Sequence, residues 1–374
     1  MPNLVPPVVG QRRFDPQAPG QTRVVGFLDS VRGVLWARRR RPNQVRYLLS
    51  VAHERFQPDD LLTQAVEAEQ AGFDGVCCSD HLEPWWAPNA PTPAACGNAW
   101  VWLGAVGQAT TRVALGPAVT GLLHRYNPVV VAQQVATLGR LFPGRAFLGV
   151  GSSEAMNEIP AGLEWPSPAD QLRRTEESLT IIKRLLDGET VDYAGEFFRA
   201  RSARLHVKPE RRPPVYMSAF YEQAAEVAGR LADGVWTLGD PRQAGPVIAA
   251  YRRGAEQAGR EPGEIILQTL ASWGSDDEAA LAGSREWKGT LVDEHYTDAI
   301  ADPAEIGRNG EQQVSDSKFK AQAIVSADAD THVKRIGMLE KLGATTVCVM
   351  NCSGSDPHGL IRAYGERVLP ELRF

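Results

Sequence analysis

Two ionisable side chains stand just after short apolar segments of the sequence. His81 follows Asp80 at the end of segment 75–79, and Glu154 is the third residue after segment 146–151. An imidazole titrates near neutral pH, so His81 is suited to removing a proton from a substrate. A carboxyl group in a pocket can donate a proton or stabilise charge, which would be the role of Glu154. The ordinary alternatives are a hydrogen-bonded structural histidine and a carboxylate that caps a helix.

An adjacent pair of tryptophans lies close to His81 in the sequence. Trp85 and Trp86 are large enough to form the wall of a pocket for an aromatic ring, although tryptophans also pack in ordinary cores. The pocket interpretation is favoured when the pair is taken together with His81 and Glu154, because each group follows an apolar segment. The pattern therefore predicts proton transfer inside a partly aromatic pocket.

Other familiar catalytic motifs are missing from the sequence. Segment 149–154 resembles a dinucleotide fingerprint, but its last position is Glu154, whose carboxylate would repel a pyrophosphate. His53 and Glu54 lack a second histidine at helical spacing, so no metal site is predicted. A Walker loop and a GxSxG motif are both missing, which argues against a hydrolase. Since the cysteines show no CxxC spacing, the neighbours Cys77 and Cys78 are expected to be buried thiols.

The elements that must position these residues repeat in a regular order. Short apolar segments alternate with longer amphipathic stretches, and continuous apolarity is typical of parallel strands that are buried on both faces. Eight such units predict an α/β fold of the TIM-type (β/α)8 barrel, with a doubly wound sheet as the alternative. In a barrel the residues after each strand meet on one rim, where active sites form. The predicted strands are 45–51, 75–79, 113–119, 146–151, 214–218, 234–238, 265–271 and 345–350.

Helix signals and two insertions fall between the predicted strands. Segment 58–71 has acidic residues in its first turn and stops at Gly72, as helices commonly do. Helices are also expected over 127–141 and 170–186. Segment 191–207 predicts a small hairpin, and the long polar segment 287–320 predicts helices. In a barrel, such insertions tend to build the substrate end.

Composition restricts the class of protein and its location. The chain has 374 residues, of which 43% are hydrophobic and 23% charged, and its net charge is −5. These values are typical of a globular enzyme without a strong field for nucleic acid. The sequence has no apolar run near 18 residues and no arrangement typical of a secretion signal, so we expect a cytoplasmic enzyme with no membrane or nucleic-acid partner.

The charge is unevenly distributed and suggests where the domain begins. Residues 1–44 contain eight arginines and two aspartates, a net charge of +6, which leaves −11 for the remainder. We interpret 1–44 as a basic, flexible extension and 45–374 as one barrel domain. A nucleic-acid-binding arm is the alternative, but Trp36 is the only aromatic residue beside the arginine run 38–41.

Three motifs together resemble those of the luciferase-like flavin and deazaflavin oxidoreductases. Within that family, the sequence is most similar to the group of F420-dependent glucose-6-phosphate dehydrogenases and hydroxymycolic acid dehydrogenases, over about residues 45–374. The motifs are Ser79-Asp80-His81-x-x-Pro84-Trp85, His124-Arg125-Tyr126-Asn127-Pro128 and Phe147-Leu148-Gly149-Val150-Gly151-x-x-Glu154-Ala155-x-Asn157-Glu158.

The resemblance implies a cofactor and a division of roles. It implies a TIM barrel that binds coenzyme F420, an 8-hydroxy-5-deazaflavin whose C5 accepts a hydride. His81 would be the base that takes the hydroxyl proton, and Trp85 would shield the reacting centre. Glu154 would lie near the ring edge of the cofactor, and Glu54 would be a further pocket carboxylate. The implied cofactor-binding residues are Asp80, Ala118, Val119, Ser152, Ser153, Asn157, Ser218 and Ala219, with a non-proline cis bond between Ala118 and Val119.

The sequence departs from the family at two sets of positions, those that contact the phosphate of the cofactor and those that contact the phosphate of the substrate. Relatives have two glycines after the fifth strand, where this chain reads Ser218-Ala219-Phe220-Tyr221. Sugar-phosphate oxidising members carry two lysines and an arginine around a threonine. The threonine matches Thr237, whereas the basic positions fall on Asp240, Thr297 and Gln322. A relocated clamp could come from Arg285, Lys288, Lys318 and Lys320, unless these are ordinary surface cations.

The expected function is an F420-dependent dehydrogenase that moves a hydride from a CH–OH group to the deazaflavin. A sugar 6-phosphate is the favoured substrate, and a non-phosphorylated alcohol or specialised metabolite is the alternative. The rival functions are an FMN-dependent monooxygenase of the same family, a non-catalytic flavin-binding barrel and an interaction protein that works through residues 1–44. A homodimer is expected from the resemblance.

Overall fold

Parallel strands form a ring of eight positions in the computed structural model, which describes residues 44–88 and 94–373. The strand order is β3-β2-β1-β12-β10-β9-β8-β5-β4. Leu115 bridges to Ala146 just before β5, and β4 pairs with β5, so β3 and β4 together occupy the eighth position and close the ring. The strands are β1 (Arg46–Val51), β2 (Gly75–Cys78), β3 (Ala114–Pro117), β4 (Thr120–Gly121), β5 (Leu148–Gly151), β8 (Val215–Ser218), β9 (Gly234–Leu238), β10 (Glu264–Ser272) and β12 (Thr346–Asn351).

This ring confirms the predicted barrel and all eight predicted strands, with shifts of no more than two residues at their ends. A short strand, β11 (Ile324–Val325), pairs with the end of β10 outside the ring. Every pairing within the ring is parallel, so all strands end at the same rim. The residues that follow the strands are thereby brought together.

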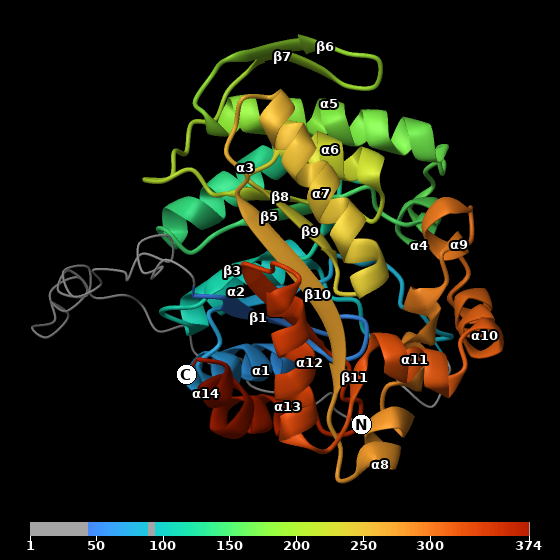
Figure 1. The fold of residues 1–374 in the computed structure, drawn as a ribbon. Helices are drawn as coiled ribbons and strands as arrows, with labels where there is room; N and C mark the ends of the chain where they lie inside the picture. Colours follow the sequence, from blue (N-terminus) through green and yellow to red (C-terminus); the bar gives the residue numbers. More distant parts are fainter. Residues whose placement is uncertain (1–43, 89–93, 374) are drawn as a thin grey trace, which may run out of the picture. The chain divides into compact units, whose positions relative to one another are not determined.

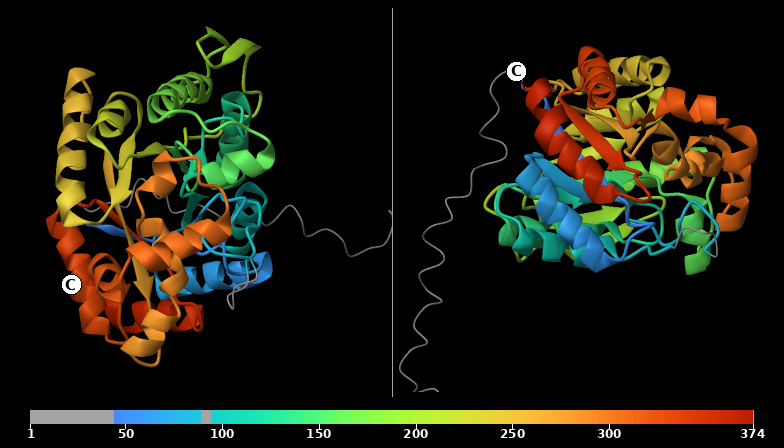
Figure 2. Two further views of the ribbon diagram at one scale, coloured as in Figure 1. Left: turned by 90° about the vertical axis from the view of Figure 1, so that its right-hand side faces the viewer. Right: turned by 90° about the horizontal axis from the view of Figure 1, so that it is seen from below.

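Helices lie outside the strands (Figures 1 and 2). The helix predicted over 58–71 is α1, and Gly72 ends it with a φ of 95°, a conformation that glycine adopts without a steric penalty. The helices predicted over 127–141 and 170–186 are α3 and α5, capped by the side chains of Asn127 and Ser167. The outer helices are α1 (Pro58–Ala71), α2 (Ala99–Ala109), α3 (Pro128–Leu141), α5 (Pro168–Leu186), α6 (Glu222–Leu231), α7 (Pro241–Gln257), α12 (Ala329–Lys341), α13 (Pro357–Ala363) and α14 (Leu369–Leu372), with a π-helical turn Tyr364–Val368 before α14.

Side chains from the first halves of the strands fill the inside of the ring. Phe147, Tyr216 and Trp236 pack there with their ring centroids about 6 Å apart, together with the buried thiols of Cys77 and Cys348. Cys77 and its neighbour Cys78 are both fully buried, as predicted. This layer fills the interior of the barrel below the carboxyl ends of the strands.

Both predicted insertions are present. Residues 191–207 contain an antiparallel hairpin, β6 (Val191–Ala194) and β7 (Arg199–Ala203). The second insertion packs on the loop after β2, where Trp287 meets Trp86 at a ring distance of 5.2 Å. Figure 2 shows its helices in orange, grouped on one side of the barrel. They are α8 (Asp277–Ala282), the 3-10 helix Arg285–Leu291, α9 (Glu294–Thr297), α10 (Pro303–Gln313) and α11 (Asp316–Gln322).

The predicted basic extension, residues 1–44, lies outside the described residues except for Gln44. Among the helices that the structure describes, none combines the length and the apolar character needed to cross a lipid bilayer.

Candidate active site

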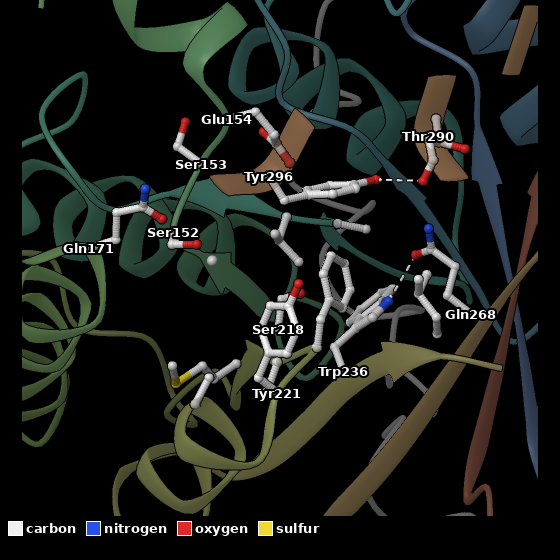
Figure 3. A pocket seen from close by; sticks show the side chains of 18 of the residues that line it. Ser152, Ser153, Glu154, Gln171, Ser218, Tyr221, Trp236, Gln268, Thr290 and Tyr296 are labelled. Carbon is white, nitrogen blue, oxygen red and sulfur yellow. Dashed lines mark hydrogen bonds between the residues drawn. The ribbon is translucent and has the colours of Figure 1, made fainter. Parts of the chain in front are cut away.

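A cavity of about 520 Å³ opens at the carboxyl ends of the strands (Figure 3). Its volume is within the range of small-molecule sites, about 300–1,000 Å³. Strand ends supply much of the lining, which confirms that the residues after the strands converge on one rim. These contributions are Ser79, Gly151, Ser218, Leu238, Leu270 and Met350.

His81 lies in this cavity between two carboxyl groups. Its Nδ1 is 3.5 Å from Oε1 of Glu54, and its Nε2 is 3.8 Å from Oε2 of Glu154. The side chain of Glu54 is fully buried, whereas that of Glu154 is 20% exposed. The imidazole therefore has a closed side toward Glu54 and a more open side toward Glu154.

Burial changes the acidity of all three groups. It raises the pKa of Glu54 to about 7, and neither oxygen has a hydrogen-bond partner among the described residues. Burial also raises the pKa of Glu154 to about 7, against the effect of a hydrogen bond from Asn157. The pKa of His81 is lowered by burial and by the charge of Arg125. A neutral imidazole beside two carboxyl groups that titrate near pH 7 can act as a general base.

Asn157 positions Glu154 from behind the cavity wall. Its Nδ2 donates to Oε2 of Glu154 over 2.8 Å, and its Oδ1 accepts from the backbone N–H of Leu82 over 2.7 Å. The two bonds join the loop after β5 to the loop that carries His81. Asn157, predicted from the resemblance as a cofactor contact, lies outside the cavity lining.

Asp80 also lies behind the lining rather than in it. Its carboxylate accepts hydrogen bonds from Thr120 (2.9 Å) and Tyr126 (3.2 Å) and lies 3.5 Å from the guanidinium of Arg125. Arg125 donates a further hydrogen bond to the backbone carbonyl of Asp80. This cluster fixes the residue before His81 and joins the loops after β2 and β4.

Replacing Asp80 by alanine should destabilise the protein, because it leaves Arg125 without its carboxylate in a nearly dry site. The structure exposes only 2% of Asp80, and removing one partner of such a pair typically costs about 3–5 kcal/mol. Urea unfolding followed by circular dichroism measures the change. Asp60→Ala, on the exposed first turn of α1, is the control and should leave the midpoint nearly unchanged. A similar midpoint for both variants would contradict this interpretation.

Aromatic side chains form the wall beside His81. The rings of His81 and Trp85 are 5.4 Å apart, and Trp85 lies 5.6 Å from Tyr296. Tyr296 meets Phe220 edge-on at 5.3 Å and donates a hydrogen bond to the carbonyl of Thr290 over 3.0 Å (Figure 3). The resemblance implied Trp85 in this place. Sequence reasoning missed Tyr296, because nothing in its polar insertion shows which side chain faces the cavity.

Serine hydroxyls and a short apolar segment form another part of the lining. Ala118 and Val119 line the cavity, and the peptide bond between them is cis, as the resemblance implied. Ser153 has a φ of 62°, and its Oγ has no hydrogen-bond partner in the described part of the chain. Gly121 permits this placement, because a Cβ there would lie 2.4 Å from Cβ of Ser153. The predicted residues Ser152, Ser218 and Ala219 line the cavity as well.

The predicted substrate-binding residues are not part of this lining. Thr237 lies between Trp236 and Leu238 on β9, and both of these neighbours line the cavity. Because successive side chains of a strand point to opposite sides, the side chain of Thr237 points away from the cavity. Arg285 pairs with Asp316, and Lys288 pairs with Asp316 and Glu311. Exposed positions on α11 are occupied by Lys318 and Lys320. A relocated phosphate clamp gains no support from this arrangement.

Comparisons with known proteins agree with the fold. A family model described as luciferase-like monooxygenase matches residues 38–346. A protein of Microbacterium testaceum, named F420-dependent glucose-6-phosphate dehydrogenase, is 36% identical over 334 residues, which cover 88% of this chain and 98% of that protein.

Two solved structures are similar as well. An F420-dependent secondary alcohol dehydrogenase in complex with an F420–acetone adduct has a TM-score of 0.84 and 32% identity, covering 88% of this chain and 100% of that one. The coenzyme F420-dependent tetrahydromethanopterin reductase from Methanopyrus kandleri has a TM-score of 0.71 and 21% identity, and the match covers 88% of this chain and 99% of that one. At this level of identity, the similarity shows the fold alone.

Proposed function

The chain belongs to the luciferase-like monooxygenase family, and from this premise we propose that it is an F420-dependent dehydrogenase that removes a hydride from the CH–OH carbon of an alcohol. The observation that carries the proposal is His81, held between Glu54 and Glu154 at the wall of the cavity. A base in this position takes the hydroxyl proton while the carbon gives up its hydride. The Microbacterium testaceum relative and the secondary alcohol dehydrogenase, both above 30% identity, are named as F420-dependent dehydrogenases.

The lining fits a flavin-like ring on its own chemistry. Ala118 and Val119 offer an apolar surface, while Ser152, Ser153 and Ser218 offer hydroxyl groups. The free Oγ of Ser153 can bind a polar atom of the ring edge. These residues would hold the deazaflavin, which when bound supplies the acceptor of the hydride.

We assign proton uptake to Nε2 of His81. Nδ1 faces the fully buried Glu54, so the substrate hydroxyl has room only on the side of Glu154. A neutral imidazole accepts the proton, and the carboxylate of Glu54, 3.5 Å from Nδ1, stabilises the imidazolium that forms. Overall, the alcohol loses a hydride from carbon and a proton from oxygen, and a carbonyl group results.

The rival functions make different predictions. An FMN-dependent monooxygenase would use FMN and oxygen, whereas the two relatives above 30% identity that are described here are named for F420. A non-catalytic flavin-binding barrel would bind a cofactor without turnover. An interaction protein acting through residues 1–44 would lose its function when that segment is deleted, whereas the dehydrogenase should keep near-full activity.

The choice of alcohol and the assembly are finer parts of the proposal. The name of the 36% identical relative supports the expectation of a sugar 6-phosphate. We also propose a cytoplasmic location, as the sequence pattern indicates, and a homodimer, as the resemblance implies. Light scattering coupled to size-exclusion chromatography measures the assembly, and a monomer at micromolar concentration would contradict the dimer.

The direct test is loss of the absorbance of oxidised F420 when purified protein meets a panel of alcohols. We expect turnover of at least one alcohol with F420. When FMN replaces F420, we expect no turnover of any alcohol in the same panel. Tight binding of FMN with oxygen consumption would instead support the monooxygenase. Binding of F420 without turnover of any alcohol or carbonyl compound would support the non-catalytic barrel.

The rate of alcohol oxidation should rise with pH and level off above about pH 7. The carboxylates of Glu54 and Glu154 stabilise the imidazolium of His81 only when ionised, and burial raises both pKa values to about 7. Below that pH, kcat/KM should fall about tenfold per pH unit for each carboxylate that must be ionised, and the apparent pKa belongs to the pair. Initial rates between pH 5.5 and 9, with F420 calibrated at each pH, measure the profile. A flat profile from pH 6 to 8 would exclude this role.

A further inference from the structure

We infer that the alcohol this protein oxidises is uncharged and largely apolar, and that it is not a sugar phosphate. This inference rests on the proposed function and narrows its substrate class. It follows from the charges and the surfaces that the cavity presents. A phosphate would have to enter a site whose ionisable lining consists of His81, two glutamates and two tyrosines.

The cavity has no cation to hold a phosphate. Among the described residues that line it, none is lysine or arginine, and the anionic groups are Glu54 and Glu154. Sites for phosphate monoesters depend on charge-assisted hydrogen bonds from cations. A dianion placed beside two carboxyl groups that ionise near pH 7 would be repelled and left without a partner.

The positions that match basic residues in sugar-phosphate oxidising members carry no available positive charge. Thr297 lines the cavity, and its hydroxyl donates to Asp298 over 3.0 Å. Gln322 donates to Asp240 over 3.2 Å. A hydrogen bond from Arg242 lowers the pKa of Asp240 to about 2, so this carboxylate is ionised at neutral pH. The guanidinium of Arg242 is therefore already paired with Asp240.

The cations of the neighbouring insertion are engaged elsewhere or point into solvent. Arg285 lies 2.9 Å from Asp316, and Lys288 lies 2.9 Å from Asp316 and 3.0 Å from Glu311. Lys288 is also 4% exposed, so it cannot swing toward a ligand without breaking both pairs. A phosphate would therefore have to displace existing ion pairs.

The surface next to His81 is suited to hydrocarbon instead. The rings of Trp85, Tyr296 and Phe220 form a continuous wall, and Leu291 lines the same cavity. Contact with such a wall favours apolar substituents on the carbinol carbon, at roughly 25 cal/mol per Å² removed from water. The hydroxyl would point to His81 while the carbon substituents lie against the rings.

The first test compares four alcohols with the full chain and F420: propan-2-ol, cyclohexanol, glucose and glucose 6-phosphate. We expect kcat/KM for cyclohexanol to exceed that for glucose 6-phosphate at least 100-fold. A preference for glucose 6-phosphate would overturn the inference while leaving the proposed dehydrogenase intact. If none of the four alcohols or their carbonyl products exchanges a hydride with F420, the proposed function fails as well.

The second test measures binding without turnover. Isothermal calorimetry of the unmodified protein, with and without F420, should show that glucose 6-phosphate binds no more tightly than glucose. Tighter binding of the phosphate by tenfold or more would overturn the inference.

A variant pair tests the missing cation itself. Thr297→Lys places an ammonium group on the cavity wall and should tighten glucose 6-phosphate binding at least tenfold, whereas the neutral variant Thr297→Gln should not. Equal gains in both variants would overturn the electrostatic explanation. Circular dichroism confirms the fold of each variant. If a variant does not fold, the calorimetry of the unmodified protein with glucose 6-phosphate and glucose still tests the inference.

Discussion

Replacing His81 by alanine should lower kcat for alcohol oxidation about 10²- to 10⁴-fold, the usual contribution of a positioned general base. The imidazole lies within 4 Å of carboxyl oxygens of both Glu54 and Glu154 in the cavity. Without it, the hydroxyl proton has no neutral acceptor beside the aromatic wall. The serine hydroxyls that would hold the cofactor remain, so the affinity for F420 should change no more than a few-fold.

Stopped-flow measurement of F420 reduction in a single turnover separates the chemical step from product release. His206→Ala is the matched control, because it removes an exposed imidazole far along the chain from the site, and it should leave the rate unchanged. Added imidazole should restore part of the lost rate in His81→Ala if the defect is the missing base. A loss of less than tenfold would show that another group takes the proton.

Glu54→Gln should change stability and activity in opposite directions. Glu54 is fully buried without a hydrogen-bond partner among the described residues, and burial raises its pKa from 4.5 to about 7. The folded state therefore binds a proton that the unfolded state releases between these two pH values. Stability falls as pH rises from about 4.5 to 7, and the full penalty, on the order of 3 kcal/mol, is present above pH 7.

The neutral amide avoids this penalty. The variant should unfold at a higher denaturant concentration than the unmodified protein at pH 8, and at nearly the same concentration at pH 4.5. Its kcat should nevertheless fall about tenfold or more, because no carboxylate then stabilises the imidazolium of His81. Glu261→Gln, at an exposed site between α7 and β10, is the control for losing a carboxylate. Equal stability at both pH values would show that Glu54 is not destabilised by burial.

The sequence by itself determined the barrel and the location of its rim chemistry. Strands buried on both faces must be continuously apolar, so eight such segments separated by helices are visible without a structure. Parallel connections then require every strand to end at one rim, which is why His81, Trp85 and Glu154 were placed in one cavity from their positions after strands. These conclusions depend on local pattern and topology, and both are encoded along the chain.

Only the tertiary structure decided which other side chains face the cavity and what charge they meet. Tyr296 and Lys288 lie in the same insertion, yet Tyr296 lines the wall while Lys288 pairs with Asp316 and Glu311. The insertion consists of short helices joined by loops, so no periodicity fixes the direction of a side chain. The raised pKa of Glu54 likewise comes from burial, which depends on distant segments packing around it. Packing between segments far apart in the chain is not written in any local pattern, and so the electrostatics of the site became visible only in the folded molecule.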